Sequence, residues 1–132
     1  MNKTVVDTDV ISFLFKNDTR AALYKPHLTG KLLVISFMTI AELDRWALKR
    51  NWGDSRRAKM EEHLKNFVIY PFNRELCRKW AVVKTETEKA GKSISDADSW
   101  IASTALLYNI PLTTHNRSHF THIKNLIIIS EG

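Results

Sequence analysis

The sequence predicts an α/β fold built around a mainly parallel sheet of four or five short strands. Five short segments, each apolar on both alternating faces, are spread along the chain: residues 4–6, 32–35, 67–70, 111–113 and 126–129. Segments with helical spacing lie between them, and strands that alternate with helices are typical of parallel sheets. No repeat and no Gly/Ser linker divides the 132 residues, so we expect a single domain, residues 1–132.

Three of the intervening segments carry apolar residues at the period of an α-helix. The positions are Ile40, Leu43 and Ala47 in the first segment, Leu76, Trp80, Val83 and Thr87 in the second, and Ile101, Ala102, Ala105 and Tyr108 in the third. Residues 90–93, AGKS, separate the second segment from the third, and Pro111 follows the third. These breaks predict where the helices end.

The composition limits the possible environments and partners. No apolar run approaches the roughly 20 residues of a membrane helix, and Asp7 interrupts the N-terminus before the apolar core of a secretory signal can form. The single cysteine, Cys77, cannot form an internal disulfide. We therefore expect a cytoplasmic protein without a membrane segment. The net charge of +6 and the pI of about 9.6 favour a polyanionic partner.

Much of the excess positive charge falls between residues 45 and 65. The candidate nucleic-acid-binding residues there are Arg45, Lys49, Arg50, Arg56 and Arg57. A solvated helix face explains the same pattern equally well. Trp52, which lies within this polar stretch, is a candidate for stacking on a base or for contacting a protein partner.

Three carboxylates occupy equivalent places in separate strand-to-helix units. Asp7 ends the first strand, Glu42 lies in the first turn of the helix after the second strand, and Asp98 begins a later helix. In a parallel sheet the carboxyl ends of the strands share one edge, where ligands bind. A cluster of carboxylates without cysteine suits Mg²⁺ or Mn²⁺.

Helix capping is an alternative role for two of these acids. Thr39 precedes Glu42 by three residues, and Ser95 precedes Asp98 by the same spacing, so each pair could form a capping box. An acid in the first turn gains only about 0.3 to 1 kcal/mol from the helix dipole. Two carboxylates about 5 Å apart repel by roughly 3 kcal/mol at an effective dielectric near 20. Convergence of all three would therefore require a cation or a shared proton.

Two further acids lie close in sequence to these candidates. Asp96 and Asp98 are two residues apart, which places their side chains about 200° apart on a helix, and we favour Asp98 for the site. Asp96 could start the helix or act through a water molecule. Asp9 could cap a helix that begins at Val10 or could support the site from the second layer of contacts.

The segments that carry these acids resemble the PIN-domain family, specifically the VapC-type ribonuclease toxins of prokaryotic toxin–antitoxin pairs. The matching segments are VVDTDVISFL, ISFMTIAELDRWA, ISDADSWIASTALLYNIPLTTHNRSHF and LIIIS, which together span nearly the whole chain. The resemblance assigns the family's acids to Asp7, Glu42 and Asp98. A fourth position that is acidic in many members is Asn116 here, which leaves open whether one or two metals bind.

The resemblance also implies a three-layer α/β/α sandwich, Mg²⁺ or Mn²⁺ dependence, a homodimer, and inhibition by a small VapB-like antitoxin. In this interpretation Asp7 and Asp98 hold a metal that binds a scissile RNA phosphate. Glu42 completes the ligand shell or orients the attacking water. Thr114 and Asn116 are candidates for supporting contacts or for binding a phosphate oxygen, although a turn role fits them equally. His119 is a candidate for contacting substrate phosphate.

Three other interpretations remain. His115, His119 and His122 are close in sequence, but their spacing and the lack of a nearby cysteine fit zinc poorly. The DTD sequence, with Asp7 and Asp9, resembles the nucleophile and acid of haloacid-dehalogenase-like phosphatases. A non-catalytic module that binds RNA or a partner would keep the fold without using the acids.

Overall fold

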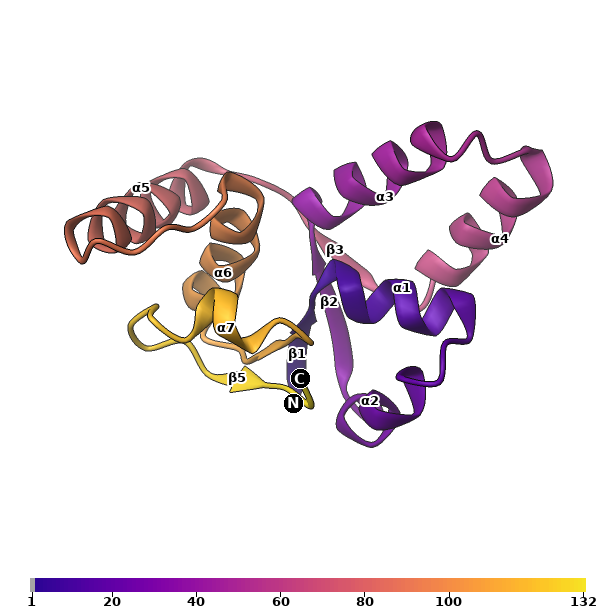
Figure 1. Ribbon diagram of the computed structural model, residues 1–132, viewed down its shortest axis with the longest axis horizontal. Helices are drawn as coiled ribbons and strands as arrows, with labels where there is room; N and C mark the ends of the chain where they lie inside the picture. Colours follow the sequence, from indigo (N-terminus) through magenta and orange to yellow (C-terminus); the bar gives the residue numbers. More distant parts are fainter. Residues whose placement is uncertain (1) are drawn as a thin grey trace.

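The computed structural model describes residues 2–132. Its centre is a five-stranded sheet in the order β3-β2-β1-β4-β5, and every pairing is parallel. The strands are β1 (Lys3–Val6), β2 (Leu32–Ser36), β3 (Val68–Tyr70), β4 (Leu112–Thr113) and β5 (Ile128–Ile129). Helices cover both faces of this sheet (Figure 1). The predicted α/β fold with a parallel sheet and three layers is therefore confirmed.

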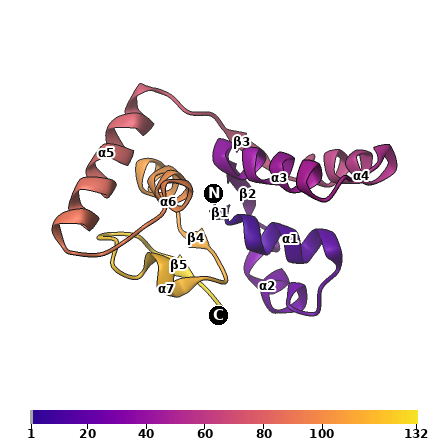
Figure 2. The same ribbon diagram turned by 45° about the horizontal axis from the view of Figure 1, so that its top comes forward.

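Seven helices form the outer layers: α1 (Thr8–Lys16), α2 (Ala21–Leu28), α3 (Phe37–Lys49), α4 (Asp54–Leu64), α5 (Arg74–Lys89), α6 (Asp96–Tyr108) and α7 (Arg117–Phe120). Helices α1 to α4 lie on one side of the sheet and α5 to α7 on the other (Figures 1 and 2). No helix was expected at α2 or α4. Helix α4 buries only Met60, so it has no apolar period. Helix α2 buries Ala21, Tyr24 and Leu28 at helical spacing, but it contains Pro26, which is rare inside a helix.

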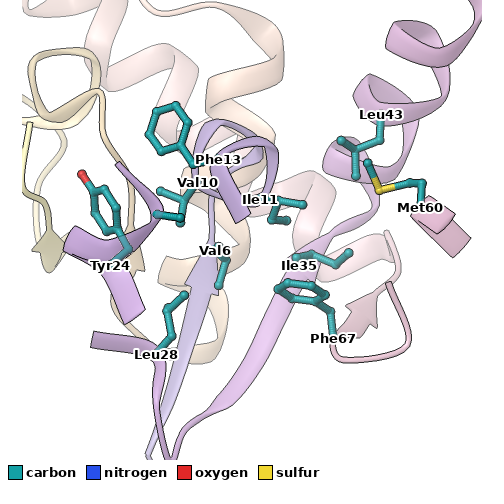
Figure 3. Packing of buried hydrophobic residues seen from close by; sticks show 11 residues of the cluster. Val6, Val10, Ile11, Phe13, Tyr24, Leu28, Ile35, Leu43, Met60 and Phe67 are labelled. Atoms are coloured by element: carbon teal, nitrogen blue, oxygen red, sulfur yellow. The ribbon is translucent and has the colours of Figure 1, made fainter. Parts of the chain in front are cut away.

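The two layers have separate apolar cores because successive strand residues face opposite sides of the sheet. Val6 and Ile35 contribute to the core beneath α1 to α4, whereas their neighbours Val5 and Val34 contribute to the core beneath α5 and α6. Figure 3 shows the first core, in which Tyr24 and Phe13 lie beside Val10. This double burial explains why the central strands are apolar at consecutive positions.

Strand β3 differs from the sequence expectation. Its predicted burial on both faces is wrong, because Val68 is 41% exposed and Ile69 is 48% exposed. The reason is its position at the edge of the sheet, where it pairs only with β2. An edge strand with exposed apolar side chains is a surface for pairing with another chain.

The capping residues are also partly different from the expected ones. Helix α3 begins at Phe37 and is capped by Ser36, whose hydroxyl accepts from Met38 N–H, so the proposed Thr39 cap is wrong. Glu42 consequently lies in the second turn. Helix α6 has the expected cap, in which the Ser95 hydroxyl accepts from Asp98 N–H.

Trp52 belongs to an aromatic cluster that joins α1, α3 and α4. Its ring lies 4.7 Å from that of Trp46 and 5.5 Å from that of Phe15, and the Arg56 guanidinium lies 4.6 Å above it. Such cation–π and aromatic contacts contribute about 0.5 to 1.5 kcal/mol each. Trp52 therefore has a packing role that links the α3–α4 pair to the body of the protein.

Across residues 2–132 the structure contains no helix whose length and apolar character would allow it to cross a membrane.

Candidate active site

Asp7 lies at the carboxyl end of β1, next to the point where the strand order reverses between β1 and β4. Ligands of parallel α/β sheets bind at this position. Asp7 is also the N-cap of α1: one oxygen accepts from Thr8 N–H at 2.7 Å, and the other accepts from the Thr114 hydroxyl at 2.7 Å. The side chain is therefore buried but hydrogen-bonded.

Asp9 lies in the first turn of α1, because the helix begins at Thr8 and not at Val10 as expected. Its Oδ1 accepts from Val10 N–H at 2.7 Å, and its Oδ2 accepts from His115 N–H at 3.1 Å. Asp9 thus connects α1 to the loop that follows β4. It does not have the expected helix-capping position, which belongs to Asp7.

Glu42 reaches the same edge from α3, where a threonine of α1 fixes its orientation. The Thr8 hydroxyl lies 2.7 Å from Glu42 Oε1 and donates to it, and the same hydroxyl is 3.0 Å from that of Thr39. Neither Thr8 nor Thr39 was identified as a site residue from the sequence. No spacing in the sequence indicates the Thr8 contact, because it depends on α1 beginning at Thr8.

Asp98 completes the group from the first turn of α6. Its Oδ2 lies 3.1 Å from Nδ1 of His119, which comes from the short helix α7. Four carboxylates thus approach the same edge of the sheet: Asp7, Asp9, Glu42 and Asp98. Asp98 does so from a helix that follows α5, so its expected place directly after a strand is wrong.

The ionisation behaviour of these acids shows that they affect one another. Burial raises the pKa of Asp7 to about 8, and the charges of Asp9 and Asp98 act in the same direction, against the hydrogen bonds from Thr114 and Thr8. Burial also raises the pKa of Asp9, where the Asp98 charge contributes. The pKa of Glu42 is raised by burial and by Asp98 and Asp9, while the Thr8 hydrogen bond lowers it. Mutual repulsion of this kind is typical of functional acidic sites.

The chemistry of these donors fits a hard divalent cation. Carboxylate and hydroxyl oxygens are the ligands that Mg²⁺ and Mn²⁺ prefer, and a cation would relieve the repulsion among the buried charges. Within residues 2–132, however, no three His, Cys, Asp or Glu side chains form a ready coordination sphere. Asp7 and Asp9 accept hydrogen bonds on both oxygens, whereas Glu42 accepts on Oε1 and Asp98 contacts His119 through Oδ2.

The remaining candidates divide into those near the carboxylates and those away from them. Thr114 contacts Asp7 directly, and its hydroxyl accepts from Asn116 N–H at 3.0 Å, so both residues belong to the same loop turn. Asp96 lies elsewhere: it pairs with Lys84 of α5 at 3.1 Å, and its side chain is 77% exposed. The structure thus brings Asp98, and not Asp96, to the other acids.

The five candidate nucleic-acid-binding residues lie on the α3–α4 pair. Arg45, Lys49 and Arg50 are exposed near the end of α3. Arg56 covers the rings of Trp52 and Phe15, and Arg57 donates from Nε to the Trp52 carbonyl at 3.1 Å. Two of the five therefore have a packing role in addition to their charge.

The three clustered histidines have different surroundings. His115 Nδ1 lies 2.6 Å from the hydroxyl of the fully buried Tyr24, whereas His119 contacts Asp98. Nε2 of His122 is buried and has no hydrogen-bond partner in the described part of the chain. The Tyr24–His115 contact was not anticipated from the sequence. It holds in place the loop in which His115 N–H donates to Asp9.

Replacing Thr8 by Val is expected to cost about 1 kcal/mol of stability, because Glu42 loses the hydrogen bond that orients it. The same loss should raise the pKa of Glu42 further. Urea unfolding and an NMR titration of the Glu42 carboxyl measure the two effects. Thr8→Ser keeps the hydroxyl and should restore both values; equal changes in both variants would show that Thr8 acts only by packing.

Fold and site together define a class: an α/β protein with a buried acidic site at the carboxyl edge of a parallel sheet. The family model for the PIN domain matches residues 4–126, and the chain belongs to this family. The predicted resemblance is confirmed. Because the chain belongs to the PIN-domain family, the alternative interpretation of its DTD sequence as that of a haloacid-dehalogenase-like phosphatase is not supported.

Curated relatives cover most of the chain. Ribonuclease VapC1 of Haemophilus influenzae is 34% identical over 125 residues, which is 92% of each chain. Ribonuclease VapC1 of Methanocaldococcus jannaschii is 31% identical over 128 residues, covering 93% of this chain and 82% of the relative.

Solved structures show the same fold. A chain in the structure of VapBC2 from Rickettsia felis, bound to a DNA fragment from the promoter, matches with a TM-score of 0.88 at 23% identity. The match covers 98% of this chain and 99% of the other. VapBC-1 from nontypeable Haemophilus influenzae matches with a TM-score of 0.78 at 26% identity, over 97% of each chain.

Proposed function

We propose that this protein is a metal-dependent endoribonuclease that acts as the toxin of a VapBC-like toxin–antitoxin pair. The observation that carries the proposal is the gathering of Asp7, Asp9, Glu42 and Asp98 at one sheet edge in a chain whose relatives are named VapC ribonucleases. A non-catalytic module would gain nothing from burying carboxylates that repel one another.

In this proposal Asp7, Glu42 and Asp98 hold Mg²⁺ or Mn²⁺, and Asp9 joins them or supports them. A divalent cation at this place would neutralise a scissile phosphate and make a bound water more acidic. The Thr114 hydroxyl orients Asp7, and the Thr8 hydroxyl orients Glu42. His119 holds one oxygen of Asp98, which directs the carboxylate.

Glu42 is the proton acceptor that we propose for the attacking water. Its burial is only partial, its pKa is raised by that burial and by the charges of Asp98 and Asp9, and its Oε1 is oriented by the Thr8 hydroxyl. Asp7 is less suitable, because both of its oxygens already accept hydrogen bonds. The division of roles follows from these different contacts.

The proposed partners are an RNA substrate, a small VapB-like antitoxin and a second copy of the chain. Solved VapBC complexes contain a chain with the fold of this protein, which supports the proposal of an antitoxin partner. The exposed basic residues Arg45, Lys49 and Arg50 support binding to RNA phosphates. Val68, Ile69 and the 66% exposed Phe72 form an apolar edge that supports a homodimer. We also propose a cytoplasmic location, where the RNA substrate is found.

The proposal predicts that the purified protein cuts a 5′-labelled single-stranded RNA at internal positions when Mg²⁺ or Mn²⁺ is present. EDTA should stop the reaction, and added Mn²⁺ should restore it. The variant Asp7→Asn, Glu42→Gln, Asp98→Asn, purified in parallel, measures any contaminating nuclease. RNA that stays intact under every condition, or cleavage that continues in EDTA, would contradict the proposal.

A further inference from the structure

A cavity of about 490 Å³ lies between α5, α6 and the segment that follows α7. These elements form the layer opposite the α3–α4 pair (Figure 1). The walls come from one face of α5 together with its C-cap Ala90, from Leu106 of α6 and from residues 122–125. The volume is within the range of small-molecule sites, roughly 300 to 1,000 Å³. None of the four clustered carboxylates lines it, so it is separate from the candidate active site.

The wall of the cavity toward the protein interior is apolar. Val83 and Ile123 are buried there, Leu106 is half-buried, and Val82 extends the apolar surface outward with 48% exposure. Aliphatic side chains of this kind accommodate a flat ring, because burying its faces removes apolar surface from water.

The charged residues that line the cavity are mainly cationic. Lys79, Lys89 and Lys124 line it, against a single acid, Glu86. Within residues 2–132 none of these four side chains takes part in an ion pair, whereas Lys84 on the same helix pairs with Asp96. Three lysines without acidic partners give the cavity a positive potential that favours an anion.

His122 provides an unsatisfied polar atom in the same wall. Its Nε2 is buried and has no hydrogen-bond partner within the described residues. A buried polar atom without a partner costs about 1 to 3 kcal/mol, so such atoms usually have a ligand or another group to pair with. Since Nε2 is closed off from solvent, a ligand oxygen would pair with it after the imidazole ring turned toward the cavity.

We propose that this cavity binds a small organic anion, consisting of a flat apolar ring that carries a phosphate or carboxylate group. The ring would lie against Val83, Leu106 and Ile123, and the anionic group would face the lysines and His122. The proposal concerns a second site and does not depend on the ribonuclease activity.

Binding can be tested by NMR on the full chain, with adenosine monophosphate as the probe that combines a ring and a phosphate. We expect saturable shifts of the amides of residues 82–90 and 122–125, with a dissociation constant below about 1 mM. Adenosine and inorganic phosphate, added separately, should each bind at least about tenfold more weakly, because each makes only part of the contacts. Benzoate in a parallel titration distinguishes a carboxylate ligand from a phosphate ligand.

Two variants locate the site. Lys124→Glu should weaken adenosine monophosphate binding at least about fivefold, and His122→Phe, which keeps a ring but removes both nitrogens, should also weaken it. Lys59→Glu reverses an exposed lysine of α4 and should leave binding unchanged, and so should Asp98→Asn. The same spectra show whether each variant is folded. Absence of saturable shifts up to about 10 mM, shifts that disappear in Asp98→Asn, or full affinity in Lys124→Glu would overturn the proposal.

Discussion

Replacing Asp98 by Asn is expected to slow RNA cleavage about a thousandfold or more, with a change of less than about 1 kcal/mol in the free energy of unfolding. The large loss is expected because Asn removes one negative oxygen from the carboxylates that would bind the cation. The small stability effect is expected because the Asp98 side chain is partly exposed and pairs with the exposed His119. Steady-state cleavage of a labelled RNA and urea unfolding of the same preparation measure the two quantities.

Asp96→Asn is a matched control for this experiment. It makes the same change in charge, two residues away on the same helix, but Asp96 pairs with Lys84 on the outer side. Its cleavage rate should stay within about twofold of the unaltered protein, since exposed pairs contribute little. Equal losses in the two variants would show that net charge, and not a metal site, controls the rate. Full activity in Asp98→Asn would remove Asp98 from the mechanism.

The metal-free protein is expected to become less stable as the pH rises from about 4 to about 8. Asp7 has an ordinary pKa of 3.8 and a folded-state pKa raised to about 8 by burial and by its acidic neighbours. Below pH 3.8 both the folded and the unfolded chain hold the proton. Between the two values only the folded chain keeps it, so each rise of one pH unit costs about 1.4 kcal/mol for this proton. Above about 8 this dependence should end.

Urea unfolding in EDTA, followed by tryptophan fluorescence, measures this dependence at each pH. Asp7→Asn should remove most of the slope and should raise the stability at pH 8, because an amide keeps the size of the side chain without the buried charge. Asp18→Asn is the control: Arg20 holds the pKa of the Asp18 carboxyl below its usual range, so this variant affects only the acid end of the curve. A slope that is unchanged in Asp7→Asn would contradict the burial of an ionisable Asp7 in a repulsive cluster.

The strands and their parallel arrangement could be predicted because burial on both faces leaves a simple pattern in the sequence. Val5 and Val6 must both be apolar when the sheet has helices on each side. The sequence pattern does not show whether a strand lies at the edge of the sheet. Val68 and Ile69 were therefore expected to be buried, although β3 pairs on one side only. Strand order depends on contacts between distant segments, which local periodicity does not contain.

The site could be predicted in outline for a related reason. A parallel sheet brings the residues that follow its strands to one edge, which sufficed to expect Asp7 and Glu42 there. Asp98 begins a helix that follows α5 and not a strand, so this rule does not place it. Local helix geometry showed that Asp96 and Asp98 cannot both face one site, but it did not decide between them. The position of Asp9 beside these acids, and the hydroxyl contact of Thr8 with Glu42, depend on where α1 begins. A shift of two residues in a helix start changes which side chains face the site, and the sequence leaves such boundaries uncertain.

Hydrogen bonds from the loop after β4 were the least predictable part. Tyr24, His115 and Asp9 are joined through a side-chain contact and a backbone N–H, from three segments far apart in the chain. Nothing in the spacing of these residues indicates that they meet. Their arrangement follows from the packing of α2 against the C-terminal strand region, where the Tyr24 hydroxyl also accepts from Glu131 N–H.

Anomalous diffraction from crystals of the protein grown with Mn²⁺ tests the central claim most directly, because it locates the ion without relying on activity. The account predicts a manganese peak bounded by oxygens of Asp7, Asp98 and Glu42 or Asp9, and the loss of that peak in Asp98→Asn crystals. A peak only at other positions, or none at a saturating Mn²⁺ concentration, would show that the four carboxylates gather for another reason.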